Sequence, residues 1–307
     1  MFYAGRVTTI DPSARIDLHT HSLRSDGRGS PSQVMREAAA AGLDIVALTD
    51  HDTVAGWDEA RETAREVGLG FIPGIELTTR VQRNAEHKFT VHMLAYLPDP
   101  NDAALARILQ DSVDSRVIRL QQITERLAED FDINWQHVEE ILADGKVAGR
   151  PAIADAMIER GIIESREPFF DWVRPGTKYY VPNRGVPETI DAIGLIRNAG
   201  GVPVLAHPMA RGHGPLPGEP MPRKHYIELI EAGMAGVEVY HRDVPQHVRE
   251  WLLALADEFG FFVTGSSDYH GTGKPNQLGE NLTTAGALQA ILEQARQPSL
   301  ASLNYGK

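Results

Sequence analysis

The chain has 307 residues, of which 42% are hydrophobic and 23% are charged, as is usual for a soluble globular protein. It contains no cysteine, which excludes disulfides and thiolate-bound zinc, so any metal must be held by nitrogen and oxygen. The formal net charge of −12 argues against a surface for duplex nucleic acid, which is normally basic. We find no signal peptide and no apolar run near the roughly 20 residues that span a bilayer, so we expect a cytoplasmic protein without a membrane partner.

Short β-branched runs alternate with amphipathic helical patterns along most of the chain. The predicted strands are 15–22, 44–50, 69–79, 88–97, 202–207, 236–241 and 261–267, and the main predicted helices are 31–41, 56–67, 187–199, 224–232, 246–259 and 284–296. The first helix begins with Ser30 as a candidate N-cap, Pro31 at the first position and Gln33 at the third. Repeated alternation predicts a parallel sheet, and seven units predict a closed or nearly closed α/β barrel.

The alternation is interrupted between residue 99 and residue 182. Helical patterns cover 102–130, 135–142 and 151–160, and a loop rich in proline, glycine and aromatic residues follows at 174–180. We interpret 99–182 as a helical insertion that covers the active site. Residues 1–98 and 183–307 would together form the barrel.

Metal-capable side chains stand at the ends of the predicted strands. Two residues apart on one strand, His19 and His21 project from the same face. The full set is His19, His21, Asp26, His51, Glu76, His92, His207, Asp268 and His270. A lone histidine at a strand end is more often simply hydrogen-bonded, but six imidazoles and three carboxylates are more than one ion can use. Because barrel active sites lie at the carboxyl ends of the strands, the pattern predicts hydrolysis at a multinuclear metal centre.

The segments that carry these residues resemble the PHP family, named for polymerase and histidinol phosphatase domains. They are DLHTHS at 17–22 with DG at 26–27, LTDHD at 48–52, GIE at 74–76, AHP at 206–208 and GSSDYH at 265–270, in the family's order. The resemblance implies a distorted seven-stranded TIM-like (β/α) barrel with an inserted helical subdomain. It also implies a hydrolase of phosphate esters with Glu76, His207 and Asp268 in the catalytic set.

The same resemblance implies two to three divalent ions of manganese, iron or zinc. The first ion would be held by His19, His21, Glu76 and Asp268, the second by Asp26, His51 and His270, and the third by Glu76, His92 and His207. Asp17 and Asp52 would orient imidazoles, and Ser266 and Ser267 would hydrogen-bond a ligating carboxylate. Such ions lower the pKa of bound water toward about 7 and so supply hydroxide for attack on phosphorus.

Three arginines of the insertion form a candidate second anion site. Arg116 and Arg119 are i,i+3 neighbours on a predicted helix, and Arg150 directly precedes the helix that begins at Pro151. Arginines on helices are usually solvated or paired with nearby acids, so the pattern alone leaves both readings open. It becomes specific through a resemblance to the 3′,5′-nucleoside bisphosphate phosphatase subgroup of PHP proteins.

That resemblance implies that Arg116, Arg119 and Arg150 bind the 5′-phosphate while the metals act on the 3′-phosphate, with Asp26 and His51 also facing the substrate. The sequence departs from the subgroup after Arg150, where Pro-Ala stands in place of Thr-His. We therefore predict a phosphomonoesterase that converts a nucleoside 3′,5′-bisphosphate, a small phosphorylated nucleotide, into the 5′-monophosphate and phosphate. The alternatives are a 5′-3′ exoribonuclease on short 5′-phosphorylated RNA, a histidinol-phosphate-type phosphatase and a metal-binding regulatory domain; the oligomeric state stays open.

Overall fold

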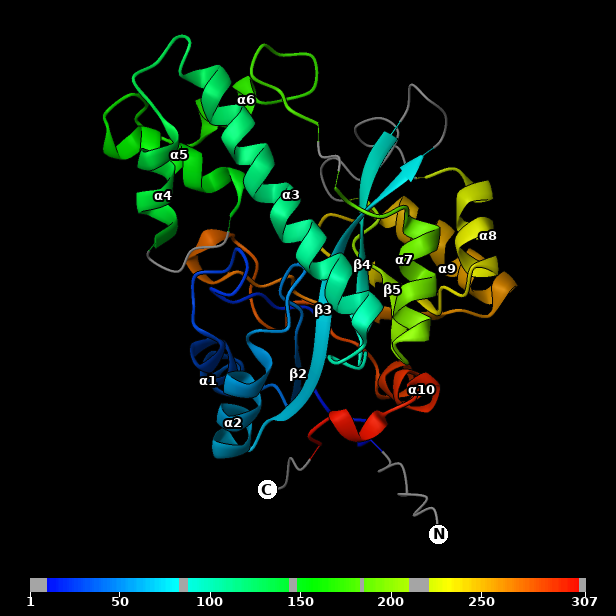
Figure 1. The fold of residues 1–307 in the computed structure, drawn as a ribbon. Coiled ribbons are helices and arrows are strands. Elements are labelled where there is room, and N and C mark those ends of the chain that lie inside the picture. The colour runs from blue at the N-terminus through cyan, green and yellow to red at the C-terminus, as the bar shows by residue number, and fades with distance from the viewer. Residues whose placement is uncertain (1–9, 83–87, 144–147, 183–184, 210–220, 304–307) are drawn as a thin grey trace.

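Seven strands form a single sheet that curls into a nearly closed barrel (Figure 1). The computed structural model describes residues 10–82, 88–143, 148–182, 185–209 and 221–303. The strands follow one another around the sheet as β1 (Ile16–Asp17), β2 (Ile45–Leu48), β3 (Gly70–Gln82), β4 (Lys88–Tyr96), β5 (Val202–Leu205), β6 (Gly236–Tyr240) and β7 (Phe262–Gly265). A parallel bridge between Thr20 and Tyr269 joins the two edges. The predicted α/β barrel is therefore confirmed.

Strand β4 runs antiparallel to both of its neighbours, so the prediction of a wholly parallel sheet is wrong at this place. Its pairing with β3 extends from Gly74–Tyr96 to Gln82–Lys88, with only residues 83–87 between the two strands. A parallel pair needs a crossover of a dozen or more residues, whereas an antiparallel pair can be joined by a short turn. The missing helix at this point of the sequence explains the reversed strand.

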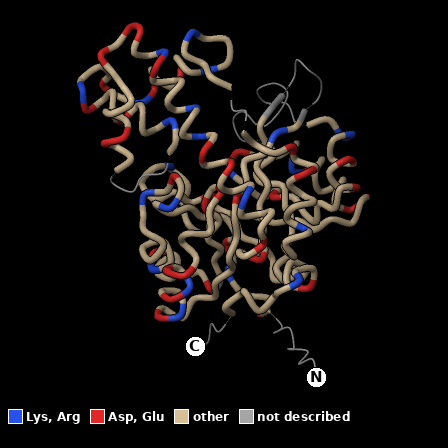
Figure 2. Tube along the Cα trace, in the orientation of Figure 1, with Lys and Arg blue, Asp and Glu red and all other residues tan. Residues whose placement is uncertain are grey.

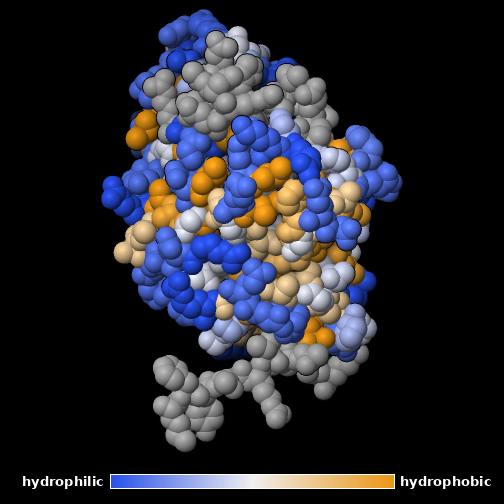
Figure 3. Space-filling view, turned by 90° about the vertical axis from the view of Figure 1, so that its right-hand side faces the viewer, coloured by the Kyte–Doolittle hydropathy of each residue, from blue (hydrophilic) through white to orange (hydrophobic). Residues whose placement is uncertain are grey.

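Among the described residues, five helices cover the barrel from outside: α1 (Pro31–Ala40), α2 (Trp57–Val67), α7 (Thr189–Asn198), α8 (Arg223–Glu231) and α9 (Gln246–Phe259). Helix α10 (Ala285–Gln294) instead packs at one end of the barrel against inward-facing strand residues such as Ile45 and Ala47. The predicted start of α1 is confirmed, because Ser30 and Gln33 form a reciprocal capping box behind Pro31. Figure 3 views the side on which α8 and α9 lie and shows mostly hydrophilic side chains around a central group of apolar ones. In the described residues, no helix is both long and apolar enough to cross a membrane.

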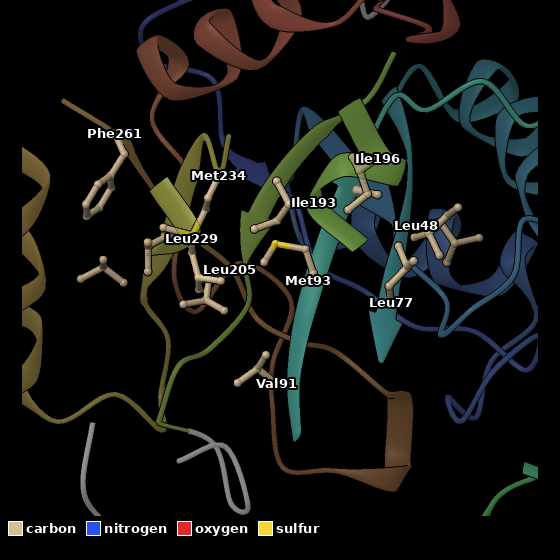
Figure 4. Packing of buried hydrophobic residues seen from close by; sticks show 14 of the residues in the cluster. Leu48, Leu77, Val91, Met93, Ile193, Ile196, Leu205, Leu229, Met234 and Phe261 are labelled. Atoms are coloured by element: carbon tan, nitrogen blue, oxygen red, sulfur yellow. The ribbon is translucent and has the colours of Figure 1, made fainter. Parts of the chain in front are cut away.

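Alternate residues of the strands enter two separate hydrophobic clusters. Val46 and Leu48 of β2 join the cluster that packs against the outer helices, whereas Ile45 and Ala47 join the other cluster. Figure 4 shows Leu77, Met93 and Ile193 of the outer cluster, which come from β3, β4 and α7. Because side chains alternate between the two faces of a strand, the sheet is buried on both sides and its strand ends are held in fixed positions.

In the described part of the chain, four helices lie between β4 and α7: α3 (Ala103–Leu127), α4 (Trp135–Ala143), α5 (Arg150–Glu159) and α6 (Glu167–Trp172). The short helix α6 was not predicted. Together these helices bury a third hydrophobic cluster that includes Ile123, Met157 and Phe169. The long helix α3 runs from the barrel, where it contacts α7, to this cluster (Figure 1). It thereby carries the arginines of its middle section past the edge of the barrel.

Candidate metal centre

The carboxylate of Glu76 lies at the centre of the predicted metal-binding residues and is only 1% exposed. Its Oε1 atom lies 2.7 Å from His92 Nδ1 and 2.9 Å from His207 Nε2. Its Oε2 atom lies 3.1, 3.0 and 3.3 Å from His19 Nε2, His21 Nε2 and His51 Nδ1. The two oxygens thus face two different groups of imidazoles, as a carboxylate that bridges two ions would.

The reversed strand β4 explains how His92 reaches this carboxylate. In the β3–β4 ladder His92 pairs with Thr78, which is two residues beyond Glu76 and therefore on the same face of β3. On the other side, His51 forms a parallel bridge with Glu76 as the chain leaves β2. Three neighbouring strands therefore bring these side chains to one place.

A second carboxylate, that of Asp268, closes the cluster from the end of β7. Its Oδ1 atom lies 3.2 Å from His21 Nε2, 3.6 Å from His19 Nε2 and 3.4 Å from His270 Nδ1. Beyond it, Asp26 Oδ1 lies 2.9 Å from His270 Nε2. All nine predicted residues are consequently gathered at the same mouth of the barrel.

Potential ligand atoms fall into groups that lie within 4.8 Å of one another. These groups are His19, His21, Glu76 and Asp268; His21, Asp26, His51 and His270; His51, Glu76 and His92; and His19, His207 and Glu238. The first equals the predicted first set, and the second is the predicted second set with His21 added. The predicted third set is not one of these groups, although His92 and His207 do share one oxygen of Glu76.

The donor atoms fit divalent ions. Imidazole nitrogen and carboxylate oxygen suit manganese, iron and zinc. Among the described residues, the buried atoms His51 Nδ1, Asp268 Oδ1 and His270 Nε2 lie close to oppositely charged groups but form no hydrogen bond of good geometry, and metal coordination would satisfy them. Burial lowers the pKa of His21, but the carboxylates of Asp268 and Glu76 outweigh it and raise that pKa to about 9. The carboxylates thus demand positive charge, and protons and metal ions compete to supply it.

The described side chains of the cluster differ in how far they are exposed to solvent. His19 and His21 have fully buried side chains, whereas those of His51, His92 and Asp26 are 15%, 18% and 44% exposed. We therefore expect a substrate to meet the cluster at this exposed edge, and the position of Asp26 and His51 is consistent with their predicted place beside it.

Backbone strain also marks the site. Asp52, His207 and Asp268 have φ angles of 52°, 20° and 51°, in the region that side chains other than glycine rarely adopt. Each lies two to four residues after the end of one of the barrel strands. Such conformations persist only where the surrounding contacts hold them, and they are common at functional sites.

Glu238 on β6 belongs to the site, although the sequence did not lead us to it. It is completely buried; Oε1 lies 3.1 Å from His19 Nδ1 and Oε2 accepts the backbone N–H of His207 at 3.0 Å. Burial raises its pKa, but the nearby histidines outweigh this and lower it to about 2. The available signal was a single charged residue within the apolar strand GVEVY.

The roles predicted for Asp17, Asp52 and Ser266 need correction, and the role of the Ser267 hydroxyl stays a prediction. Asp17 accepts backbone N–H groups, from Ser267 at 3.0 Å and Gly279 at 2.9 Å, and burial raises its pKa to about 6. Asp52 accepts the N–H of Thr78 at 3.0 Å and forms an ion pair with an arginine. The hydroxyl of Ser266 donates to Glu238. Glu238, which is not one of the nine predicted ligands, is thus the carboxylate that contacts an imidazole of the cluster. Asp17 contacts backbone N–H groups instead, and Asp52 contacts a backbone N–H group and an arginine.

The three predicted substrate arginines have different surroundings. Arg116 forms an ion pair with Asp52, beside His51 of the cluster. Arg119 donates from Nε to the carbonyl oxygen of Val181 at 2.8 Å. Arg150 is the first residue of α5, and its guanidinium lies over the ring of Phe170, 5.8 Å from the centroid.

Two aromatic residues of the insertion, Trp172 and Tyr179, form contacts within the insertion itself. Trp172 stacks on Phe131 with ring centroids 5.0 Å apart, and the hydroxyl of Tyr179 donates to Asp130 at 2.7 Å. Tyr180 lies close enough to Arg119 and Arg150 to affect the pKa of both guanidinium groups. It is the tyrosine that borders the candidate anion site.

Comparisons with known proteins agree with this geometry. The PHP domain family matches residues 17–143. The chain is 30% identical to the 3′,5′-nucleoside bisphosphate phosphatase of Chromobacterium violaceum, over 85% of this chain and 89% of that protein. It is also 30% identical to the 5′-3′ exoribonuclease Rnm of Escherichia coli, over 92% and 94% of the two chains. A solved structure from Bifidobacterium adolescentis, described as a metal-dependent phosphoesterase, is similar with a TM-score of 0.82 and 37% identity, over 92% and 97% of the chains. The chain belongs to the PHP family of metal-dependent phosphoesterases, and is a hydrolase that acts on phosphate esters.

Proposed function

We propose that the protein removes the 3′-phosphate of a nucleoside 3′,5′-bisphosphate and releases the nucleoside 5′-monophosphate and phosphate. The observation that carries the proposal is a pair of neighbouring arginines, Arg119 and Arg150. Arg119 follows Arg116 by three residues on α3, and Arg116 contacts Asp52 beside the cluster. A phosphomonoesterase that needs only one phosphate has no use for a second anion site.

The two guanidinium groups lie close together without an acidic partner. Burial, and then the positive charge of Arg150, lower the pKa of Arg119 to about 10. Across the described residues, neither group forms an ion pair with a carboxylate. Two like charges that are half-buried and uncompensated favour an anion between them, and guanidinium groups bind phosphate in a bidentate manner.

The start of helix α5 adds to this site. Gly149 is its N-cap and makes no side-chain capping hydrogen bond, and Arg150 is the first helical residue. Pro151 has no N–H and the N–H of Ala152 donates to the carbonyl oxygen of Gly149 at 2.9 Å, so the backbone offers an anion the N–H of Arg150 and the positive end of the helix dipole. A phosphate bound here would receive both side-chain and backbone donors.

The position of this site relative to the cluster suits one nucleotide with two phosphates. Arg116 contacts Asp52, next to His51, and Arg119 lies one helical turn further along α3, a rise of about 4.5 Å. The 3′-phosphate would lie at the exposed edge formed by Asp26 and His51, and the 5′-phosphate at the arginine pair. Divalent ions, when bound, neutralise charge on the phosphoryl oxygens and activate water.

The residues of the chain would then orient the substrate and hold the charge balance. The arginine pair fixes the phosphate that is not cleaved, so the scissile phosphate is presented to the cluster in one orientation. Glu238 keeps the Nε2 atom of His19 directed into the cluster, because its carboxylate accepts a hydrogen bond from Nδ1 on the other side of the ring. Glu76 holds the two halves of the cluster together through its two oxygens.

A second candidate is a 5′-3′ exoribonuclease on short RNA, favoured by the likeness to the Escherichia coli enzyme. The same arginine pair would bind the 5′-phosphate of the first nucleotide, and the cluster would cut the following phosphodiester. A net charge of −12, with Lys and Arg dispersed among Asp and Glu (Figure 2), favours the small substrate over a longer strand.

The test compares kcat/KM for adenosine 3′,5′-bisphosphate, a 5′-phosphorylated oligoribonucleotide and p-nitrophenyl phosphate. We expect the bisphosphate to be the best substrate. Arg150→Ala and Arg119→Ala should each raise KM for the bisphosphate by about 10- to 100-fold, the value of one charged hydrogen bond, and leave p-nitrophenyl phosphate unchanged.

Arg107→Ala provides the matched control, since Arg107 lies on the same helix α3 and is 83% exposed. It should leave all three substrates unchanged. Equal effects of Arg150→Ala on the bisphosphate and on p-nitrophenyl phosphate would refute the assignment. A higher kcat/KM for the oligoribonucleotide would establish the exoribonuclease instead.

A further inference from the structure

Lys274 presents a positive charge beside the cluster, next to Asp268. It follows the short turn η1 (Gly271–Gly273), four residues after His270. Its Nζ atom donates to Asp268 Oδ2 at 2.9 Å, while the other oxygen of the same carboxylate, Oδ1, faces His19 and His21. The ammonium group is therefore separated from the proposed metal position by one carboxylate.

The backbone conformation and the hydrogen bonds of its loop hold Lys274 in position. Its φ and ψ angles of −136° and 160° are the extended conformation that the following Pro275 requires. The loop is tied to the barrel on both sides, by Arg28 N–H to the carbonyl oxygen of His270 at 3.1 Å and by Asn276 Nδ2 to the carbonyl oxygen of Ser267 at 2.7 Å.

The group is a cation at neutral pH. A lysine amine is protonated at neutral pH, and the Nζ atom of Lys274 lies 2.9 Å from Asp268 Oδ2. The side chain is nevertheless 41% exposed, so it also reaches the solvent that a substrate must displace.

An ion pair with Asp268 does not use the whole ammonium group. An ammonium has three N–H donors, and in the described structure one of them is directed at Asp268 Oδ2. Ion pairs with a partly exposed partner contribute little to stability, so pairing alone gives this lysine a modest role. Two donors remain for oxygens that arrive at the mouth of the cluster.

We propose that Lys274 is a catalytic residue that contacts the non-bridging oxygens of the phosphoryl group being hydrolysed. The oxygens of a phosphoryl group held at the cluster carry the charge that must be stabilised in the transition state, and a preorganised cation is suited to that. Asp268 holds the ammonium in place before the substrate binds. This inference rests on the phosphoesterase activity and is independent of the bisphosphate assignment.

The test uses the full-length, metal-loaded enzyme with Lys274→Met, which removes the charge at similar length, and Lys274→Arg, which keeps it. We expect Lys274→Met to lower kcat by about 100-fold, as loss of one charge-stabilising donor does, on both adenosine 3′,5′-bisphosphate and p-nitrophenyl phosphate. The inhibition constant of inorganic phosphate should rise by about 10-fold. Lys274→Arg should recover a large part of both effects.

Lys224→Met is the matched control, since Lys224 on α8 is 84% exposed and pairs with Glu228 in the same helix. Its kinetics should equal those of the unmodified protein. Elemental analysis separates contact with phosphate from support of the metal: Lys274→Met should keep its metal, and loss of metal in step with activity would overturn the proposal.

Two further outcomes would also overturn it. An effect confined to the bisphosphate would place Lys274 at the leaving group or at the arginine pair. A kcat and a phosphate inhibition constant within twofold of the unmodified protein would show that the lysine touches no substrate. If Lys274→Met fails to fold, Lys274→Arg and Lys274→Gln answer the same question, and equal activity of those two variants would contradict a role for the charge.

Discussion

Removal of Arg116 should destabilise the protein because it leaves a buried carboxylate without its cation. The side chain of Asp52 is 1% exposed and that of Arg116 is 18% exposed. Breaking a buried ion pair by removing one partner costs about 3–5 kcal/mol. Asp52 retains the N–H of Thr78 at 3.0 Å, so we expect the lower end of that range, about 3 kcal/mol, for Arg116→Ala.

Arg107→Ala on the same helix is the control for loss of an arginine as such. Its ion pair with Asp111 spans 3.8 Å and is exposed, so its removal should cost less than about 1 kcal/mol. The double variant Arg116→Ala/Asp52→Asn removes the unpaired charge together with its partner. It should therefore be more stable than the sum of the two single variants by about 1–3 kcal/mol.

Urea unfolding followed by circular dichroism, at one fixed metal concentration, measures these free energies. Two results would refute the reasoning: a cost for Arg116→Ala within about 1 kcal/mol of that for Arg107→Ala, or additive effects of Arg116→Ala and Asp52→Asn. A role of Arg116 in substrate binding is separable, because Asp52→Asn should restore stability in the double variant without restoring KM.

Three further changes test the cluster. Glu76→Gln should abolish hydrolysis and deplete metal, because both halves of the cluster contact this carboxylate; full metal content by elemental analysis would contradict a bridging role. Glu238→Ala should weaken metal binding by about 10- to 100-fold, since it releases the imidazole of His19 and the backbone of His207; an unchanged affinity in competition with a chelator would show that Glu238 does not position them. Gly27→Ala should lower kcat, because a Cβ atom would lie 2.4 Å from the carbonyl oxygen of His21 and the loop would have to shift; kcat equal to that of the unmodified protein would show that the loop adapts.

The cluster was predictable because its members end successive strands. Convergence of strand ends at one mouth of a barrel is a property of the fold, so His51 after β2 and His207 after β5 could be placed together without coordinates. The direction of β4 was also open to prediction, since five residues cannot form a crossover helix. The pattern of hydrophobic residues in β4 is compatible with either strand direction, whereas the short connection allows only the antiparallel one.

The surroundings of the cluster were less accessible to prediction for a physical reason. Whether Asp52 contacts an imidazole or Arg116 depends on how helix α3 packs on the barrel, and no local pattern encodes that. Glu238 differs, because a carboxylate in the middle of an apolar strand has to find a buried partner. Because a buried charge has to be compensated, the position of Glu238 in this strand indicates that it contacts a charged or polar group of the site.

The cations near the cluster divide into two kinds according to their partners, and this division bears on specificity. Arg116 and Lys274 each contact a carboxylate at the edge of the cluster, so part of the charge that they offer to a substrate is already balanced. Arg119 and Arg150 have no carboxylate partner among the described residues and lie close to each other, so an anion between them also relieves their repulsion. In a protein of net charge −12, such an uncompensated pair would attract the phosphate that, in the proposed reaction, the metals do not hold. The second phosphate of the substrate should therefore determine specificity, and an enzyme without this pair should still hydrolyse simple phosphomonoesters.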